Sequence, residues 1–255
     1  MSCGQDSVPG PGCWRVARSC ATPGADLITA HRKAQDAAKA VLRELAEDIR
    51  PDDTECSIAT RARARLQAQG IPETWYHDCP ALVLLGARSC TSVSGRDYRP
   101  AAAAVGETNL VTVDLSPSHL GRWGDCARSF AVEEGRVTST PQSPAFVAGL
   151  SFLQGLHAKM RQFVTPQTTF HELAIWSARQ MEANGFLNLD FLGNVGHSIA
   201  ARREDRIYIE RDNHRALGEV DFFTFEPHVR QIGGAWGFKH EDIFFFDAVG
   251  MLQEL

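Results

Sequence analysis

The sequence predicts an α+β protein in which helices cover one face of an antiparallel sheet and two similar halves share that sheet. Three observations support this prediction. Apolar residues recur at helical spacing in four segments, residues that begin or end these segments repeat at a constant offset, and strand-like runs follow each pair of helices. With 255 residues, of which 44% are hydrophobic and 22% charged, the chain is long enough to hold an internal duplication within one large core.

The first helix pair follows an irregular start. Residues 1–25 are rich in Gly, Pro, Ser and Cys and show no apolar period, so we expect a leader there and a single domain over 26–255. A helix that ends at Pro51 is predicted by a stripe of apolar residues spaced by three and four: Ala34, Ala38, Val41, Leu45 and Ile49. A second helix begins near Thr54 and ends at Gly70, a residue suited to a left-handed C-cap.

The second helix pair repeats this pattern. Pro144 opens a helix that Pro166 ends, and Thr169 opens the next helix, which ends at Gly185. The last three of these residues each lie 115 positions after their counterparts in the first pair. This constant offset predicts two copies of one helix-helix-sheet unit.

Strand-like runs follow each helix pair and are joined by turn-forming residues. They cover residues 108–115, 123–132, 221–229 and 238–246. Each half thus contains a predicted hairpin, and we place the halves at about 27–135 and 143–250.

Acidic residues face each other in both predicted hairpins. If each hairpin is symmetric about its turn, paired residue numbers add up to 239 in the first hairpin and 467 in the second, so that Asp114 opposes Asp125 and Glu226 opposes Glu241. Opposed Cβ atoms are only about 4.5 to 5.5 Å apart, where like charges are destabilising. A shared proton or a bound cation would relieve the repulsion.

Four converging carboxylates favour the cation. Together with His197, which follows an apolar run, they suit divalent Mn, Fe, Co or Zn. The alternatives at this point are a hydrogen-bonded core histidine and acids on solvated strand faces.

Composition excludes several classes of protein. The net charge of −5 and the pI near 6.0 argue against nucleic-acid binding. No apolar run approaches the roughly 18 residues of a membrane-spanning helix, and the N-terminus does not resemble a secretory signal. The seven scattered cysteines lack a C-x-x-C pair, which favours reduced thiols and a cytoplasmic location.

Five ordered motifs together resemble one family. They are Val111-Thr-Val-Asp114-Leu, Gly124-Asp125, Gly196-His197-Ser198-Ile, Phe223-Thr-Phe-Glu226-Pro227 and Lys239-His-Glu241-Asp. Over residues 27–250 this order resembles the "pita-bread" metallopeptidases, which include methionine aminopeptidases, proline-specific aminopeptidases, prolidases and creatinase relatives. The resemblance implies a pita-bread fold, in which two pseudo-twofold-related halves of helices pack on a curved, mainly antiparallel sheet.

The resemblance also implies a dinuclear metal centre. Asp125 and Glu241 would bridge two divalent ions, Asp114 would hold one ion, and His197 with Glu226 would hold the other. The ions would activate water for amide hydrolysis, and Glu226 would act as the catalytic proton shuttle.

Two histidines that assist catalysis in the family are replaced in this sequence. Their best-matching positions carry Ser94 and, seven residues after the ligand histidine, Glu204. We expect these two residues in the substrate-binding region, where Glu204, if it points into the cleft, favours a cationic substrate; an exposed glutamate is the alternative. His77 and His228 are candidate catalytic residues, with His77 also a candidate substrate contact, and for both the alternative is a hydrogen-bonded histidine at the sheet edge.

Three functions follow from these residues. The first is hydrolysis of an amide bond in a small peptide or amino-acid-derived substrate, as in an aminopeptidase. The second, favoured by the two replaced histidines, is a specialised biosynthetic hydrolysis or elimination on a small molecule. The third and least favoured is a non-catalytic binding module, because a scaffold gains nothing from clustered acids. A homodimer is compatible with the sequence.

Overall fold

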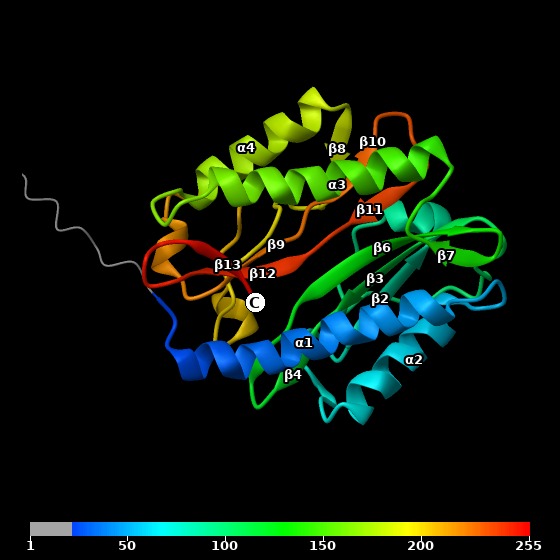
Figure 1. The fold of residues 1–255 in the computed structure, drawn as a ribbon, viewed down its shortest axis with the longest axis horizontal. Coiled ribbons are helices and arrows are strands. Elements are labelled where there is room, and N and C mark those ends of the chain that lie inside the picture. The colour runs from blue at the N-terminus through cyan, green and yellow to red at the C-terminus, as the bar shows by residue number, and fades with distance from the viewer. Residues whose placement is uncertain (1–21) are drawn as a thin grey trace, which may run out of the picture.

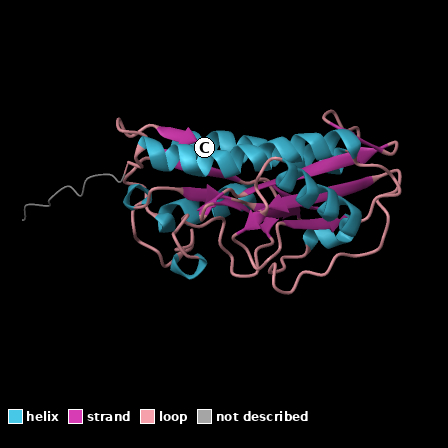
Figure 2. Ribbon diagram, turned by 90° about the horizontal axis from the view of Figure 1, so that it is seen from below, coloured by secondary structure: helices cyan, strands magenta, loops and turns pink. Residues whose placement is uncertain are grey.

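The helices form two consecutive pairs. A computed structural model describes residues 22–255, so the expected leader lies almost wholly outside the described residues. The first pair is α1 (Ala25–Asp48) and α2 (Glu55–Ala68), and the second is α3 (Pro144–Phe163) and α4 (Phe170–Ala183). Figure 1 shows one pair on each side of the strands, and Figure 2 shows the long helices along one side of the sheets.

The residues predicted to begin and end the helices act as expected. Thr54 and Thr169 cap α2 and α4, and each accepts a hydrogen bond from the backbone N–H three residues on within a capping box. After these helices Gly70 and Gly185 have φ of 76° and 73°, left-handed values that glycine adopts without strain. The repeated threonines and glycines therefore form the same helix caps in both halves.

The first half contains two antiparallel sheets. One has the order β2-β3-β6-β7 and the other the order β1-β4-β5. These strands are β1 (Glu73–Thr74), β2 (Ala81–Leu85), β3 (Asn109–Leu115), β4 (Pro117–His119), β5 (Arg122–Trp123), β6 (Cys126–Glu133) and β7 (Arg136–Thr138).

The second half again contains two antiparallel sheets. Their orders are β11-β10-β8 and β13-β12-β9. These strands are β8 (Phe186–Asn188), β9 (Phe223–Phe225), β10 (His228–Gln231), β11 (Gly237–Lys239), β12 (Asp242–Phe246) and β13 (Leu252–Glu254). The α+β class predicted from the sequence is confirmed. Across residues 22–255, the helices lack a stretch long and apolar enough to traverse a bilayer.

The register expected for the first hairpin is wrong by two. Asp114 pairs with Ala127, so paired numbers add up to 241 and the two aspartates are diagonal neighbours. The reason is the turn, in which Leu120 and Gly121 both have positive φ, of 51° and 73°. Such values are typical of a two-residue type I′ turn, which moves the hairpin midpoint by one residue.

The register expected for the second hairpin is confirmed. His228 pairs with Lys239 and Phe225 pairs with Asp242, so paired numbers add up to 467. Glu226 and Glu241 lie between these two ladders. A bridge between Ala127 and Glu241, with hydrogen bonds of 3.4 and 3.0 Å, joins the sheets of the two halves.

Each half has its own hydrophobic core. One core lies under α1 and α2 and contains the predicted apolar stripe from Ala38 to Ile49. The other lies under α3 and α4 and is rich in phenylalanine, including Phe223, Phe225 and Phe244. The two cores leave the polar residues between the hairpins at the middle of the molecule.

Candidate metal centre

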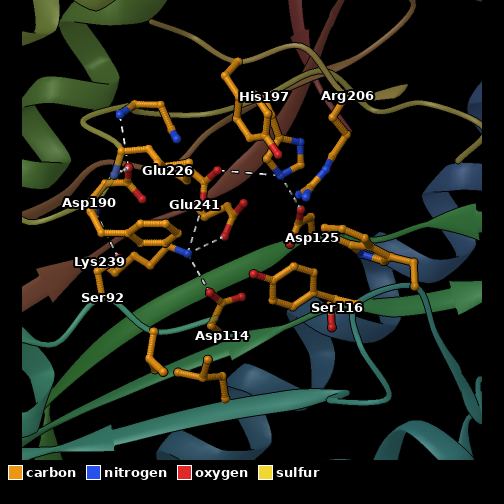
Figure 3. A pocket seen from close by; sticks show the side chains of 18 residues that line it. Ser92, Asp114, Ser116, Asp125, Asp190, His197, Arg206, Glu226, Lys239 and Glu241 are labelled. Carbon is orange, nitrogen blue, oxygen red and sulfur yellow. Dashed lines mark hydrogen bonds and ion pairs between the residues drawn. The ribbon is translucent and has the colours of Figure 1, made fainter. Parts of the chain in front are cut away.

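Five residues from both halves line one cavity of about 140 Å³. Three of them come from the ends of strands or from the breaks between strands in the two hairpins, one precedes β6, and the histidine lies in the loop after β8. Figure 3 shows their side chains pointing toward one another. They are the five residues that the sequence indicated as ligands: Asp114, Asp125, His197, Glu226 and Glu241.

The His197 ring has the orientation of a metal ligand. Its Nδ1 donates to the Ser198 carbonyl at 2.9 Å, so the neutral ring leaves Nε2 without a proton. Nε2 lies 3.4 Å from Asp125 Oδ2 and 3.6 Å from Glu226 Oε1. Three lone-pair-bearing atoms thus converge, an arrangement that a cation stabilises.

Two buried carboxylates have oxygens without hydrogen bonds. Within the described part of the chain, Asp125 Oδ2 and both side-chain oxygens of Glu241 lack a hydrogen-bond partner. Burial, assisted by neighbouring acids, raises the pKa of Asp125 to about 6 and raises the pKa of Glu241 well above its ordinary value. One atom each from Asp125, His197 and Glu241 lie within 4.8 Å of one another. This donor set fits a divalent ion.

The position of Asp125 is fixed by the first helix. The side chain of Gln35, fully buried on α1, accepts a hydrogen bond from the Asp125 N–H at 2.7 Å and donates one to the Asp125 carbonyl at 3.0 Å. Trp75 Nε1 also donates to the Gly124 carbonyl at 3.0 Å. The backbone before β6 is therefore held from two sides.

Lys239 extends its ammonium group between three of the acids. Its Nζ lies 2.5 Å from Asp114 Oδ2, 3.0 Å from Glu226 Oε2 and 3.3 Å from Glu241 Oε2. Burial tends to raise the pKa of Glu226, but the positive charge of Lys239, assisted by that of Arg206, outweighs it, and the net shift lowers that pKa. The sequence carried a signal for this contact, because residues 239 and 241 lie on one face of an extended strand.

Arg206 is a second cavity residue that the sequence interpretation missed. Its guanidinium lies 5.1 Å from the ring centroid of Trp75, 5.8 Å from that of Tyr76 and 5.4 Å from that of Tyr208. These distances are typical of cation–π contacts. No periodic pattern marks this residue, because it follows an irregular loop.

Glu204 lies outside the cavity, although it was expected in the substrate-binding region. It belongs to the 3-10 turn η2 (Arg203–Asp205) and its side chain is exposed. Arg206, which directly follows this turn and lies two residues after Glu204, lines the cavity in its place. A cationic substrate was expected only if Glu204 pointed into the cavity, and Glu204 does not line it.

The other expected site residues also lie beside the cavity. His77 has a positive φ of 50° and its Nδ1 is 2.9 Å from Arg203 Nη1, in a neighbouring cavity. His228 is buried, donates from Nε2 to the Ser89 carbonyl at 2.7 Å, and has its pKa lowered to about 4 by burial. Ser94 is half-buried and directly follows the lining residues Ser92 and Val93 in the chain.

Solved structures show the same fold at low identity. The chain matches an X-Pro aminopeptidase from Thermotoga maritima (TM-score 0.76, 17% identity, 91% of this chain and 61% of that chain). It also matches a prolidase from Thermococcus sibiricus (0.76, 18%, 91% and 59%) and the dipeptidase PepE from Mycobacterium ulcerans (0.75, 20%, 91% and 58%). The chain therefore spans about three fifths of the length of these proteins.

Comparison with protein families is more specific. No curated protein matches the sequence. The model of metallopeptidase family M24 matches residues 29–248, which include all five candidate ligands. This match confirms the resemblance seen in the ordered motifs, and the chain belongs to metallopeptidase family M24.

Proposed function

We propose that the protein is a metal-dependent hydrolase that cleaves an amide bond of a small peptide or amino-acid derivative. One observation carries the proposal: the unpaired oxygens of Asp125 and Glu241 converge with the unprotonated Nε2 of His197 in one cavity. Buried carboxylates without partners are costly, so their retention together favours a bound ion. We propose Mn, Fe, Co or Zn as that ion.

The chemistry divides between the ion and the side chains. A divalent ion held here supplies a Lewis acid and lowers the pKa of water. Glu226 has a lowered pKa and is therefore ionised near neutral pH, so it can accept a proton from water and pass it to the leaving amine. Thr224 lies close to Glu226, with Oγ1 3.5 Å from Oε1, and also accepts a hydrogen bond from the His197 N–H.

The cavity favours a small substrate with an acidic group. Its walls are formed partly by Trp75, Tyr76 and Tyr208, which hold the guanidinium of Arg206 among them. A guanidinium can bind a carboxylate through two parallel hydrogen bonds. A substrate carboxylate paired with Arg206 would lie in the same cavity as the candidate ligands.

A specialised small-molecule reaction is the second candidate. Among the lining residues in the described part of the chain, His197 is the single histidine, so the two family positions replaced in the sequence have no imidazole substitute in the cavity. This feature favours a hydrolysis or elimination that does not need those imidazoles.

A binding module is the least favoured candidate, because the candidate ligands are all present. We place the protein in the cytoplasm.

The experiment measures metal content and amide cleavage together. Protein purified without a tag is freed of metal with EDTA, reloaded with each ion, and incubated with Xaa-Pro dipeptides, Met-Ala-Ser and N-acyl amino acids while amine release is recorded. We expect at least about one tightly bound ion per chain and ion-dependent cleavage of an amide in this panel.

Two variants provide the comparison. Asp125→Asn removes a proposed ligand and is expected to abolish both metal retention and cleavage, whereas Asp52→Asn changes an exposed aspartate and should leave both intact. Failure of every ion to bind would contradict the proposed function. Metal-dependent cleavage of the acyl compounds without cleavage of either peptide class would favour the specialised reaction.

A further inference from the structure

The acid oxygens of the centre fall into two groups with different surroundings. Asp125 Oδ2 and the Glu241 oxygens lack hydrogen bonds within residues 22–255 and lie beside His197 Nε2, with Glu241 Oε2 also 3.3 Å from Lys239 Nζ. Asp114 Oδ2 and Glu226 Oε2, in contrast, contact the Lys239 ammonium at 2.5 and 3.0 Å. Figure 3 shows Lys239 on the Asp114 side of the centre and His197 on the other side.

Lys239 has the partners that an ammonium requires. An ammonium donates three N–H groups, and three carboxylates from three separate segments lie within 3.3 Å of Nζ. The backbone supports this placement, because the Lys239 N–H donates to Ser129 Oγ at 2.8 Å and β11 pairs with β10 at this residue. The side chain is only 15% exposed.

Charge alone does not decide how many ions the cavity holds. The lining includes five acids, with Asp190 in addition to the four proposed ligands, and two bases, Lys239 and Arg206. One divalent ion would bring the formal charge from −3 to −1, and two ions would bring it to +1. The geometry decides between them.

A second ion would have to share its ligands with the ammonium. In the dinuclear arrangement that the sequence resemblance implies, Asp114 holds one ion together with the bridging acids. Divalent ions bind carboxylate oxygens at about 2.0 to 2.2 Å. An ion that close to Asp114 Oδ2 and Glu241 Oε2 would lie within a few ångströms of Nζ, where two cations repel strongly.

We propose that Lys239 occupies one of the two cation positions, so that the centre holds a single divalent ion at Asp125, His197 and Glu241. The proposal rests on the proposed function in that it requires a metal centre. It assigns Lys239 as a residue that fixes the number of ions. The ammonium supplies positive charge to Asp114, Glu226 and Glu241 in place of the second ion, and it donates a hydrogen bond to Asp114 Oδ2.

The test counts ions instead of measuring activity. Wild type, Lys239→Met and the control Lys33→Met, which changes an exposed lysine of α1, are stripped and reloaded with Mn²⁺. Mass spectrometry then gives the ions per chain, and electron paramagnetic resonance separates isolated from exchange-coupled manganese. We expect one uncoupled ion in wild type and in Lys33→Met, and two coupled ions in Lys239→Met.

Other outcomes separate the inference from the proposed function. Two coupled ions in wild type would overturn the role of Lys239 while leaving a metal hydrolase intact. No bound ion in wild type would overturn the proposed function itself. One ion in both wild type and Lys239→Met would show that something other than the ammonium limits the count; if Lys239→Met does not fold, Lys239→Gln replaces it.

Discussion

Glu241 and Asp242 are adjacent acids with opposite surroundings. Asp242 accepts two hydrogen bonds from Arg128 Nη2, at 2.9 and 2.8 Å, and a third contact from His240 Nε2 at 3.0 Å. Lys39 Nζ lies 3.5 Å from its Oδ1. Glu241, which directly precedes β12, has side-chain oxygens that lack hydrogen bonds within the described residues, and its ion pair with Lys239 Nζ spans 3.3 Å.

The difference separates a structural acid from a candidate ligand. Although burial tends to raise both pKa values, the His240, Arg128 and Lys39 contacts outweigh it at Asp242 and lower that pKa, whereas the pKa of Glu241 is raised. The His157, His240 and Asp242 group also has the spacing of a metal site, but protein cations already bind its carboxylate. An acid whose oxygens lack hydrogen bonds, and not merely a cluster of ligand-type residues, therefore favours an ion.

The largest expected effect is on stability at Asp242. Asp242→Asn leaves Arg128 beside a neutral group at a buried position, which should lower the free energy of unfolding of the metal-free protein by about 3 kcal/mol at pH 7. Because the folded pKa lies well below the unfolded value of about 3.9, this contribution is fully present at neutral pH, begins to fall below about pH 4 and is lost only as the pH falls through the folded pKa. Urea unfolding at pH 7 and pH 2 measures both.

The control is Asp212→Asn, which changes an exposed aspartate and should alter the free energy by less than about 0.5 kcal/mol. An equal loss of stability for Asp242→Asn at both pH values would contradict the assignment of Asp242 as an ionised structural acid.

The neighbouring substitution should act in the opposite direction. Glu241→Gln removes a buried carboxylate whose folded pKa is raised, so the metal-free variant should be more stable than wild type at pH 7 and equally stable near pH 4. The same change should weaken ion binding by more than about 100-fold, since even substitutions around a ligand cost about 10- to 100-fold. Unfolding and titration calorimetry measure the two effects.

If the metal-free Glu241→Gln protein is less stable than wild type, Glu241 and Asp242 do not differ in their effect on the free energy of unfolding as proposed. Unchanged ion affinity in this variant would exclude Glu241 as a ligand.

The sequence predicts most of the fold because its signals are local. Capping threonines, left-handed glycines and the apolar stripe of α1 each act within one helix, and all of them recur in the structure. The predicted register of the first hairpin was wrong because Leu120 adopts a positive φ, which is not expected for a leucine. A tight turn at a non-glycine residue depends on the strands that it joins, not on the residue alone.

The candidate site divides in the same way. Its five ligand-type residues were identified because their order along the chain is distinctive. Lys239 was missed, although strand alternation carried a signal for it. Gln35 and Arg206 were missed too, because one is a polar residue on a helix face that otherwise packs in the core and the other follows an irregular loop. Their roles arise only from contacts between segments far apart in the sequence.

The smallest expected effect concerns Arg206. Its substitution should change substrate binding without changing ion binding. Arg206→Gln keeps a polar side chain but removes the charge held among the three aromatic rings, so KM for a substrate with a carboxylate should rise about tenfold, or about 1.4 kcal/mol of lost binding. The corresponding amide substrate should be affected much less, and ion content should not change, because no ion pair or hydrogen bond to a ligand side chain involves Arg206 in the described chain. Arg202→Gln, at an exposed arginine paired with Asp205, is the matched control and should leave both KM values unchanged. If the acid and amide substrates lose binding equally in Arg206→Gln, the guanidinium shapes the aromatic wall of the cavity and does not recognise a carboxylate.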